Sequence, residues 1–157
     1  GGTVEVKGTN GIRLIAAEDL FRFHLTTTVR SDEIITAAYF PELPPNSGWA
    51  IGEVTRRRGD YAVAGVCVLL SLNGDGTCAT ANLTAFGIGT RTIRLNAVEQ
   101  KLIGNRLDAQ TLADAGHLAA DYVEVADDAQ TSEAYRIHVL TNLVTRTVKR
   151  ATLRANQ

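Results

Sequence analysis

The sequence contains no methionine and has only two cysteines and three prolines among its 157 residues. Because a natural start residue is missing, we expect the N-terminus to be a trimmed, cleaved or engineered boundary, and we recognise no signal peptide. The formal net charge is −1, so no strong field steers the chain toward nucleic acid or a membrane. The longest apolar run, Ala62–Leu70, is far too short to span a bilayer.

The two cysteines, Cys67 and Cys78, flank a predicted hairpin turn, the Asn-Gly-Asp-Gly segment at 73–76. If the hairpin pairs Leu72 with Thr77, both sulfurs lie on one face but four residues apart along the strand, roughly 13 Å. A disulfide cannot span that distance. We therefore predict two reduced thiols, as in a cytoplasmic protein.

The three histidines predict no metal site, because no second ligand stands at a useful spacing from His24, His117 or His138. The sequence has no Gly-x-Ser-x-Gly nucleophile elbow, and neither cysteine has a positioned histidine. A small stand-alone hydrolase needs such a nucleophile and base. The residues alone therefore indicate no complete catalytic centre.

A hydrophobic fraction of 45% and a charged fraction of 21% are ordinary for one globular domain, or for one domain with a piece of another. In the first part of the chain the patterns predict three strands around a short helical turn: Thr3–Lys7, Ile12–Ala16, the helical turn Ala17–Phe23, and Glu33–Phe40. All three prolines then fall within residues 41–48, which we predict to be a domain boundary.

After this boundary the pattern predicts an antiparallel sheet. Strands are expected at Trp49–Arg57, Val66–Leu72 and Thr77–Phe86, with a tight turn or a single helical turn at Asp60–Ala64. Alternate positions of the hairpin are apolar and mostly small, while the opposite face carries Ser71, Thr80 and Asn82. One buried and one wetter face are typical of an antiparallel sheet covered by a single layer of helices.

Three helices are predicted to form that layer. The first runs from Leu95 to Ile103, and Asp108 caps the second, whose acidic end, Asp121–Asp128, is expected to be a solvated face or loop. Thr131 or Ser132 caps the third, which runs to about Ala155. Its C-terminal half is basic, and we interpret these cations as favoured by the helix dipole: Arg146, Lys149, Arg150 and Arg154.

Two segments invite a comparison with anion-binding sites. Residues 87–91, Gly-Ile-Gly-Thr-Arg, lack the third glycine and the Lys-Ser/Thr pair of phosphate loops, so we interpret them as a bend. Residues 56–58 are the only basic run, and they are too short and lack the interleaved aromatics of a nucleic-acid patch. They form either a solvated strand end, with Asp60 neutralising one arginine, or a set of guanidinium groups that face an anionic ligand or an acidic partner.

Four phrases in order resemble the medium, FAD-binding subunits of carbon monoxide dehydrogenase, xanthine dehydrogenase and related molybdenum hydroxylases. The resemblance extends over about residues 14–155. The phrases are Thr-x5-Asp-Glu-Ile-Ile-Thr at 26–36 with Phe-Pro at 40–41, Arg-Arg-Gly-Asp-Tyr-Ala-Val-Ala-Gly at 57–65, the helix ending in glycine at 90–104, and Ser-x-x-Tyr-Arg at 132–136.

The resemblance implies an α+β fold in which a three-stranded antiparallel sheet is covered on one face by about three helices, as in the C-terminal domain of the CO dehydrogenase flavoprotein. Residues 46–157 would form that domain, and residues 1–45 would be the end of the preceding FAD-binding subdomain. The expected partners are a molybdenum cofactor subunit, an iron–sulfur subunit and the N-terminal portion that holds the pyrophosphate of FAD. Electrons would pass from iron–sulfur clusters through FAD to an acceptor, and substrate choice would belong to the molybdenum subunit.

The same resemblance implies that this chain supplies one wall of the flavin pocket and is not catalytic by itself. Trp49 or Ile51 would contact the isoalloxazine ring, and Arg56 or Arg57 would place positive charge near the flavin. Asp60 would hold the turn through backbone hydrogen bonds. The glycine-rich loops that hold the pyrophosphate are absent from this sequence. The alternative is a non-catalytic interaction domain of the same fold that does not bind FAD alone.

Overall fold

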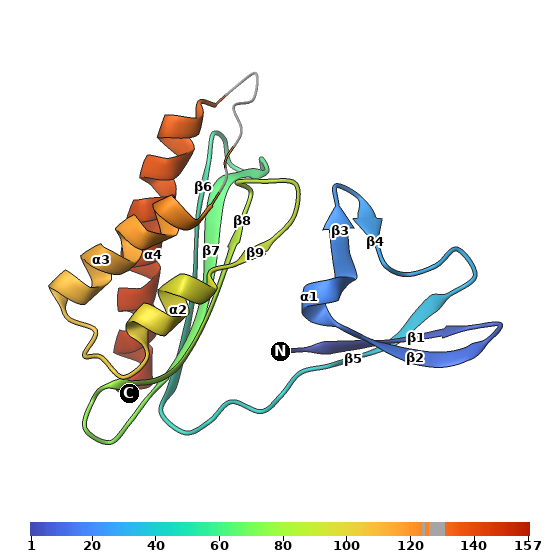
Figure 1. The fold of residues 1–157 in the computed structure, drawn as a ribbon, viewed down its shortest axis with the longest axis horizontal. Coiled ribbons are helices and arrows are strands. Elements are labelled where there is room, and N and C mark those ends of the chain that lie inside the picture. Colours follow the sequence, from blue (N-terminus) through green and yellow to red (C-terminus); the bar gives the residue numbers. More distant parts are fainter. Residues whose placement is uncertain (124, 126–130) are drawn as a thin grey trace. The chain divides into compact units, whose positions relative to one another are not determined.

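The computed structural model describes residues 1–123, 125 and 131–157, and the chain divides into two compact units (Figure 1). Unit 1 is Gly1–Leu43 and unit 2 is Pro44–Gln157. The junction falls inside the proline-rich segment that the sequence marks as a boundary. The acidic segment Asp121–Asp128, expected to be a solvated face or loop, lies for the most part outside the described residues.

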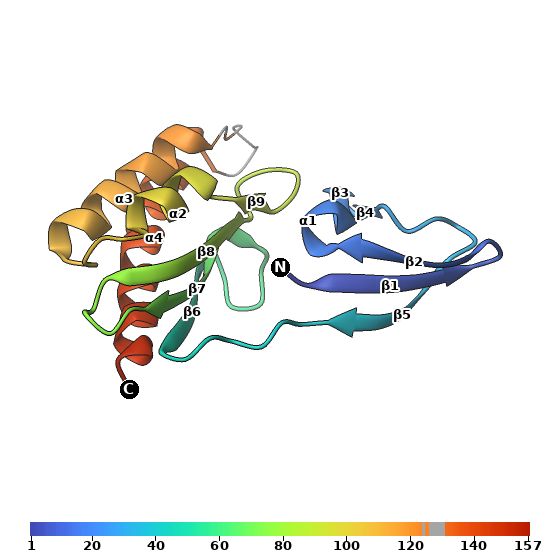
Figure 2. The same ribbon diagram turned by 60° about the horizontal axis from the view of Figure 1, so that its bottom comes forward.

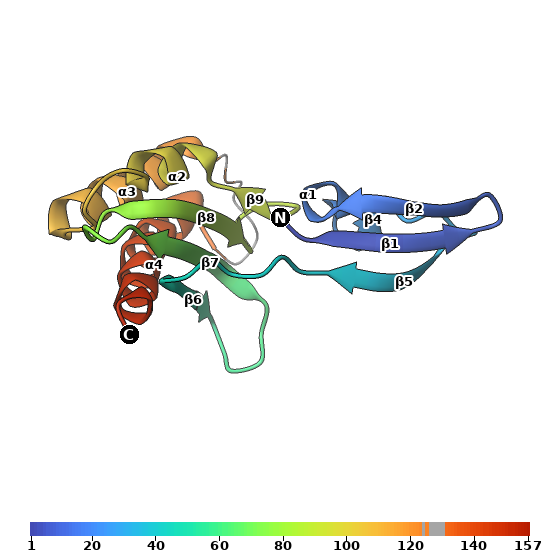
Figure 3. The same ribbon diagram turned by 90° about the horizontal axis from the view of Figure 1, so that it is seen from below.

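Unit 1 is a small β-structure with one helical turn (Figure 3). Its antiparallel three-stranded sheet has the order β2-β1-β5, and β3 and β4 form a separate pair. The core is small, with Val6, Ile15 and Leu20 buried. The elements are β1 (Thr3–Gly8), β2 (Gly11–Ala16), α1 (Ala17–Leu20), β3 (Phe21–Phe23), β4 (Thr26–Thr27) and β5 (Ile34–Tyr39).

Unit 2 has an antiparallel sheet with the order β6-β7-β8-β9. The strands are β6 (Ser47–Thr55), β7 (Ala62–Leu72), β8 (Cys78–Phe86) and β9 (Ile93–Arg94). The predicted α+β fold is confirmed, and the two-residue β9 extends the three expected strands. β6 is an edge strand, so one row of its backbone groups has no neighbouring strand.

Three helices, α2 (Asn96–Leu102), α3 (Ala109–Tyr122) and α4 (Glu133–Ala155), cover one face of this sheet (Figure 2). The side chain of Asp108 caps α3 by accepting from the N–H of Thr111, and that of Ser132 caps α4 by accepting from the N–H of Tyr135. α4 packs on β6 and β7. The other face of the sheet carries no element of unit 2 among the described residues.

The two ends of β7 differ from the sequence prediction. β7 begins at Ala62, so the expected turn at Asp60–Ala64 is shorter, because Ala62 and Ala64 already pair with β6. A bulge between Ser71 and Leu72 also places Cys78, rather than Thr77, opposite Leu72. The prediction that the two sulfurs lie on one face of the sheet is therefore wrong. Cys78 lies in the core, whereas Cys67 lies between the core residues Val66 and Val68 and so points to the opposite face. Both cysteines are free.

Candidate functional site

Trp49 and Ile51 lie on β6 and point away from the helices. The intervening residues Gly48, Ala50 and Gly52 face α4, and Ala50 is completely buried. Because side chains alternate along a strand, Trp49 and Ile51 lie on the open face, where each is 53% exposed. Two large apolar side chains are therefore presented from an edge strand.

The backbone of this part of β6 is bound by the C-terminal half of α4. Arg154 donates to the carbonyl oxygen of Trp49 at 2.6 Å, and Arg150 donates to that of Ile51 at 3.3 Å. The guanidinium of Arg154 also lies over the indole ring of Trp49, 4.2 Å from its centroid. The two arginines therefore occupy carbonyl groups of the free sheet edge, and Arg154 also covers one face of the indole.

The open face next to Trp49 and Ile51 is mixed in polarity. Leu69 pairs with Trp49 and Cys67 with Ile51, and both side chains are half-buried. On β8, Asn82 and Thr84 continue the same two rows. Burial, with a smaller contribution from the charge of Glu53, raises the pKa of the Cys67 thiol. The face therefore offers apolar contact area and hydrogen-bonding side chains, but no ready thiolate.

The turn between β6 and β7 presents cations and an aromatic ring. Asp60 donates its backbone N–H to the carbonyl of Arg57 at 3.1 Å, and Gly59 has a φ of +89°, which favours glycine. The Asp60 carboxylate lies 3.7 Å from Nη2 of Arg56. Tyr61 is 99% exposed. Arg57 has no carboxylate partner among the described residues, so it is the less neutralised of the two predicted arginines.

The structure does not bring the five predicted residues into one pocket. Arg56 and Asp60 form a pair in the β6–β7 turn, and Arg57 lies between them in the chain. Trp49 is seven residues from Arg56 along an extended chain, roughly 23 Å at strand rise. The candidate site therefore has two parts, which we call the β6 face (Trp49 and Ile51) and the tip (residues 56–61).

Sequence reasoning missed two contributions to these parts. Tyr61 is one of the residues of the Arg-Arg-Gly-Asp-Tyr phrase, and its sequence position gives no separate signal that its ring is exposed. Arg150 and Arg154 were assigned to the helix dipole, whereas they contact the backbone of β6. Their spacing of four residues places them on one side of α4, but the sequence does not reveal which strand lies there.

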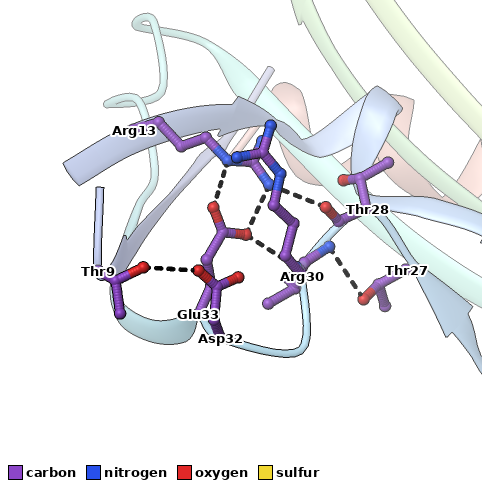
Figure 4. Close-up of polar contacts among 8 residues, drawn as sticks. Thr9, Arg13, Thr27, Thr28, Arg30, Asp32 and Glu33 are labelled. Carbon is purple, nitrogen blue, oxygen red and sulfur yellow. Dashed lines mark hydrogen bonds and ion pairs between the residues drawn. The ribbon is translucent and has the colours of Figure 1, made fainter. Parts of the chain in front are cut away.

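Unit 1 contains a polar cluster that fixes the segment before β5 (Figure 4). Arg13 donates from Nε and Nη2 to the two carboxylate oxygens of Glu33, both at 2.7 Å, and from Nη2 to the carbonyl of Thr28 at 2.8 Å. The backbone N–H of Arg30 donates to Glu33 at 2.8 Å. The hydrogen bonds from Arg13 and Arg30 hold the pKa of Glu33 at about 2.

This cluster borders a shallow surface hollow lined by Asn10, Ile12 and the charged residues Arg13, Arg30, Asp32 and Glu33. The charge of Arg13 is matched by Glu33, and Thr9 donates to Asp32 at 2.9 Å. The carboxylates therefore complete contacts within unit 1, and the cluster explains the Asp-Glu pair of the first recognised phrase as a structural feature.

Glu99 is a buried carboxylate of unit 2, and it also has a structural role. Its Oε1 accepts from the N–H of Leu83 at 2.7 Å and from Nε of Arg94 at 2.9 Å. The carboxylate binds the backbone N–H of Leu83 just beyond the β8–β9 pairing, where the Leu83 carbonyl accepts from the N–H of Leu95.

The segment 87–91 forms a bend after β8. Gly87 has a φ of +76°, and a Cβ there would lie 2.5 Å from the carbonyl oxygen of Ala62. Ile88 is completely buried. Gly87 therefore serves chain packing, and the segment forms the bend that the sequence predicts.

In the part of the chain that the structure describes, no group of three or more His, Cys, Asp or Glu side chains is arranged to hold a metal ion. Within the same residues, no helix has the length and apolar character needed to cross a membrane.

The model of the CO dehydrogenase flavoprotein C-terminal domain matches residues 49–151. Among curated proteins, the chain is 32% identical to 6-hydroxypseudooxynicotine dehydrogenase complex subunit alpha of Paenarthrobacter nicotinovorans, covering 97% of this chain and 51% of that protein. It is 30% identical to the carbon monoxide dehydrogenase medium chain of Afipia carboxidovorans, covering 99% of this chain and 54% of that protein. The chain thus spans about half the length of the curated relatives it matches.

Solved structures show the same fold over nearly the whole chain. The cyanide-inactivated Cu,Mo-CO dehydrogenase matches with a TM-score of 0.90 and 30% identity, covering 98% of this chain and 54% of that chain. Quinoline 2-oxidoreductase from Pseudomonas putida 86 matches with a TM-score of 0.90 and 26% identity, covering 100% and 54%.

Proposed function

The chain belongs to the CO dehydrogenase flavoprotein C-terminal domain family, and from this premise we propose that it is part of an FAD-binding, electron-transferring subunit of a molybdenum hydroxylase. Its partners would be a molybdenum cofactor subunit, an iron–sulfur subunit and a further FAD-binding portion. The observation that carries the proposal is the family match, because it begins at Trp49 and includes the whole tip. We further propose that residues 1–45 are the end of the preceding FAD-binding subdomain.

The described residues fit one wall of a flavin site and do not form a complete one. The β6 face supplies the apolar area of Trp49 and Ile51, and the tip supplies guanidinium groups and the ring of Tyr61. A pyrophosphate is held by converging backbone N–H groups of glycine-rich loops, and residues 87–91 lack the third glycine and the Lys-Ser/Thr pair of such loops. We therefore propose that the phosphates are held by the further FAD-binding portion.

The bound FAD would accept electrons and pass them to an acceptor. The role of this chain is to position the ring and set the charge around it. The guanidinium of Arg57 has no carboxylate partner among the described residues, so its charge is available to favour the negatively charged reduced flavin and raise the potential. Arg56 shares its charge with Asp60 and has a smaller effect. Arg154 covers one face of the Trp49 ring, so a flavin contact of Trp49 uses the remaining exposed surface.

The test is the flavin midpoint potential of the full subunit with Arg57→Ala. We expect it to fall by about 30 mV or more, which is about 1.4 kcal/mol for a two-electron couple. Thermal stability should stay nearly unchanged, because the exposed side chain of Arg57 makes no hydrogen bond or ion pair among the described residues. Arg91→Ala is the matched control, an exposed cation of the same unit outside the tip.

Two outcomes contradict the proposal. A drop in stability with an unchanged potential would make the tip arginines structural. A complex that is colourless in the flavin bands and takes up no added FAD would favour the alternative, a non-catalytic interaction domain of the same fold.

A further inference from the structure

The solvent side of α4 carries a basic ridge that the flavin proposal does not use. Arg146, Lys149, Arg150 and Leu153 are all exposed, and their spacing of three, four and seven residues places them on one side of the helix. We call these four residues the α4 ridge. Leu153 is 59% exposed, so the ridge combines an apolar side chain with three cations.

The charge of the ridge is not balanced within α4. Residues 134–157 contain no Asp or Glu. No carboxylate in the described residues lies within 4.0 Å of the ridge cations. A solvated helix face usually mixes both signs, and like charges three or four residues apart destabilise a helix. Arg146 and Lys149, and Arg146 and Arg150, are such like-charged pairs.

The local roles of basic residues explain only part of this ridge. Arg150 and Arg154 bind the carbonyl groups of Ile51 and Trp49 at the edge of β6. The helix dipole acts within the last turn and so does not reach Arg146, which lies more than two turns before Ala155. Among the described residues, the side chains of Arg146 and Lys149 therefore make no hydrogen bond or ion pair that would explain their positions.

We propose that the α4 ridge is a docking surface for an acidic patch on another subunit of the complex. Charge complementarity selects an acidic partner, and arginine is enriched at protein interfaces. The short ridge, about 10 Å long, and the net negative charge of the chain do not favour nucleic acid. Two relatives are named as a complex subunit and a medium chain, and the inference rests on the proposed function for the identity of the partner.

The test is the assembly of the full subunit, purified separately, with the molybdenum and iron–sulfur subunits, measured by sedimentation velocity. At about 50 mM NaCl, Arg146→Glu/Lys149→Glu should weaken association by about 100-fold or more, because charge reversal opposes like charges across the interface. Both side chains are exposed and neither makes a hydrogen bond or ion pair within the described residues, so the unfolding midpoint should not change. Arg22→Glu/Arg91→Glu is the matched control with the same change in net charge, and it should assemble like the parent protein.

Several results overturn the inference. One is unchanged assembly of the ridge variant, and another is equal weakening by the control. A parent chain that self-associates through the ridge, or that binds duplex DNA or phosphatidylglycerol vesicles in a ridge-dependent way, would assign the surface to a different occupant. The flavin content of the purified subunit reports separately on the proposed function. A flavin-free subunit that still assembles through the ridge would overturn that function and leave the docking surface supported.

Discussion

Replacing Gly48 with alanine tests the close approach of α4 to β6. A Cβ atom at Gly48 would lie 1.9 Å from the carbonyl oxygen of Ala151 and 2.6 Å from the backbone nitrogen of Ala155. Both atoms belong to the backbone of α4, so no side-chain rotation relieves the overlap. Ordinary van der Waals contact begins at 3.4 Å, so the helix has to move outward by roughly 1.5 Å.

The cost of this movement follows from what α4 buries. Its inward side chains Leu140, Val144 and Val148 are completely buried in the core. A gap of about 0.5–1 Å already removes about a quarter to a half of the dispersion energy of the atoms involved. Overpacking a core typically costs about 1–3 kcal/mol. Because rigid backbone obstructs the new methyl group, we expect the upper end of this range. The free energy of unfolding of unit 2 should fall by about 3 kcal/mol.

The assay is urea unfolding followed by far-UV circular dichroism, with the midpoint compared at an unchanged slope. Gly74→Ala is the matched control, because nothing lies within 4 Å of its added Cβ. The control should unfold within about 0.5 kcal/mol of the parent chain. Equal midpoints for Gly48→Ala and Gly74→Ala would refute the packing of α4 on β6.

Two further predictions use titrating groups. The Arg13–Glu33 pair lowers the pKa of Glu33 from 4.5 to about 2, so it stabilises unit 1 above pH 4.5 and this stability is lost as the pH falls toward 2. In Glu33→Gln, the loss of unit 1 stability between pH 4.5 and 2, followed through the NMR amide signals of β1, should disappear. The same loss of stability in the variant as in the parent chain would contradict the role of the pair. Burial raises the pKa of the Cys78 thiol to about 11, so at about pH 8 a thiol reagent should modify half-buried Cys67 first. Cys67→Ser should remove the native-state reaction, and rapid labelling of Cys78 in that variant would contradict its burial.

The sequence predicts the helix caps well because a cap is a local contact. Asp108 and Ser132 each accept from a backbone N–H three residues away. Such contacts depend on residue type and spacing, which the sequence displays. The sequence leaves Thr131 and Ser132 as equal candidates, and the structure selects Ser132.

The start of β7 and the register of the hairpin are harder to predict. Ala62 and Ala64 fit a tight turn or a strand equally well by composition, and only pairing with β6 decides between the two. The bulge between Ser71 and Leu72 changes the register of β7 and β8, so that Leu72 lies opposite Cys78. A shift of this kind changes which side chains face each other, so the predicted position of Cys78 fails although the strand itself is correct.

The layout of the candidate site follows partly from strand geometry. A strand from Trp49 to Arg57 already separates the apolar residues from the arginines, so two parts are implied by the sequence. The sequence does not imply the contacts of α4 with β6, because Arg150 and Arg154 are 99 and 105 residues from the carbonyl groups that they bind. Contacts at that separation depend on the tertiary fold, which no local pattern specifies.

These long-range contacts connect the two proposals. The inner side of α4 approaches β6 at Gly48, its flank holds Trp49 through Arg154, and its outer side carries the α4 ridge. Because one rigid helix serves all three, a displacement of α4 changes the setting of Trp49 and the position of Arg146 and Lys149 together. A subunit whose acidic patch docks on the ridge would restrain the same helix that fixes the indole, and thereby one wall of the flavin site.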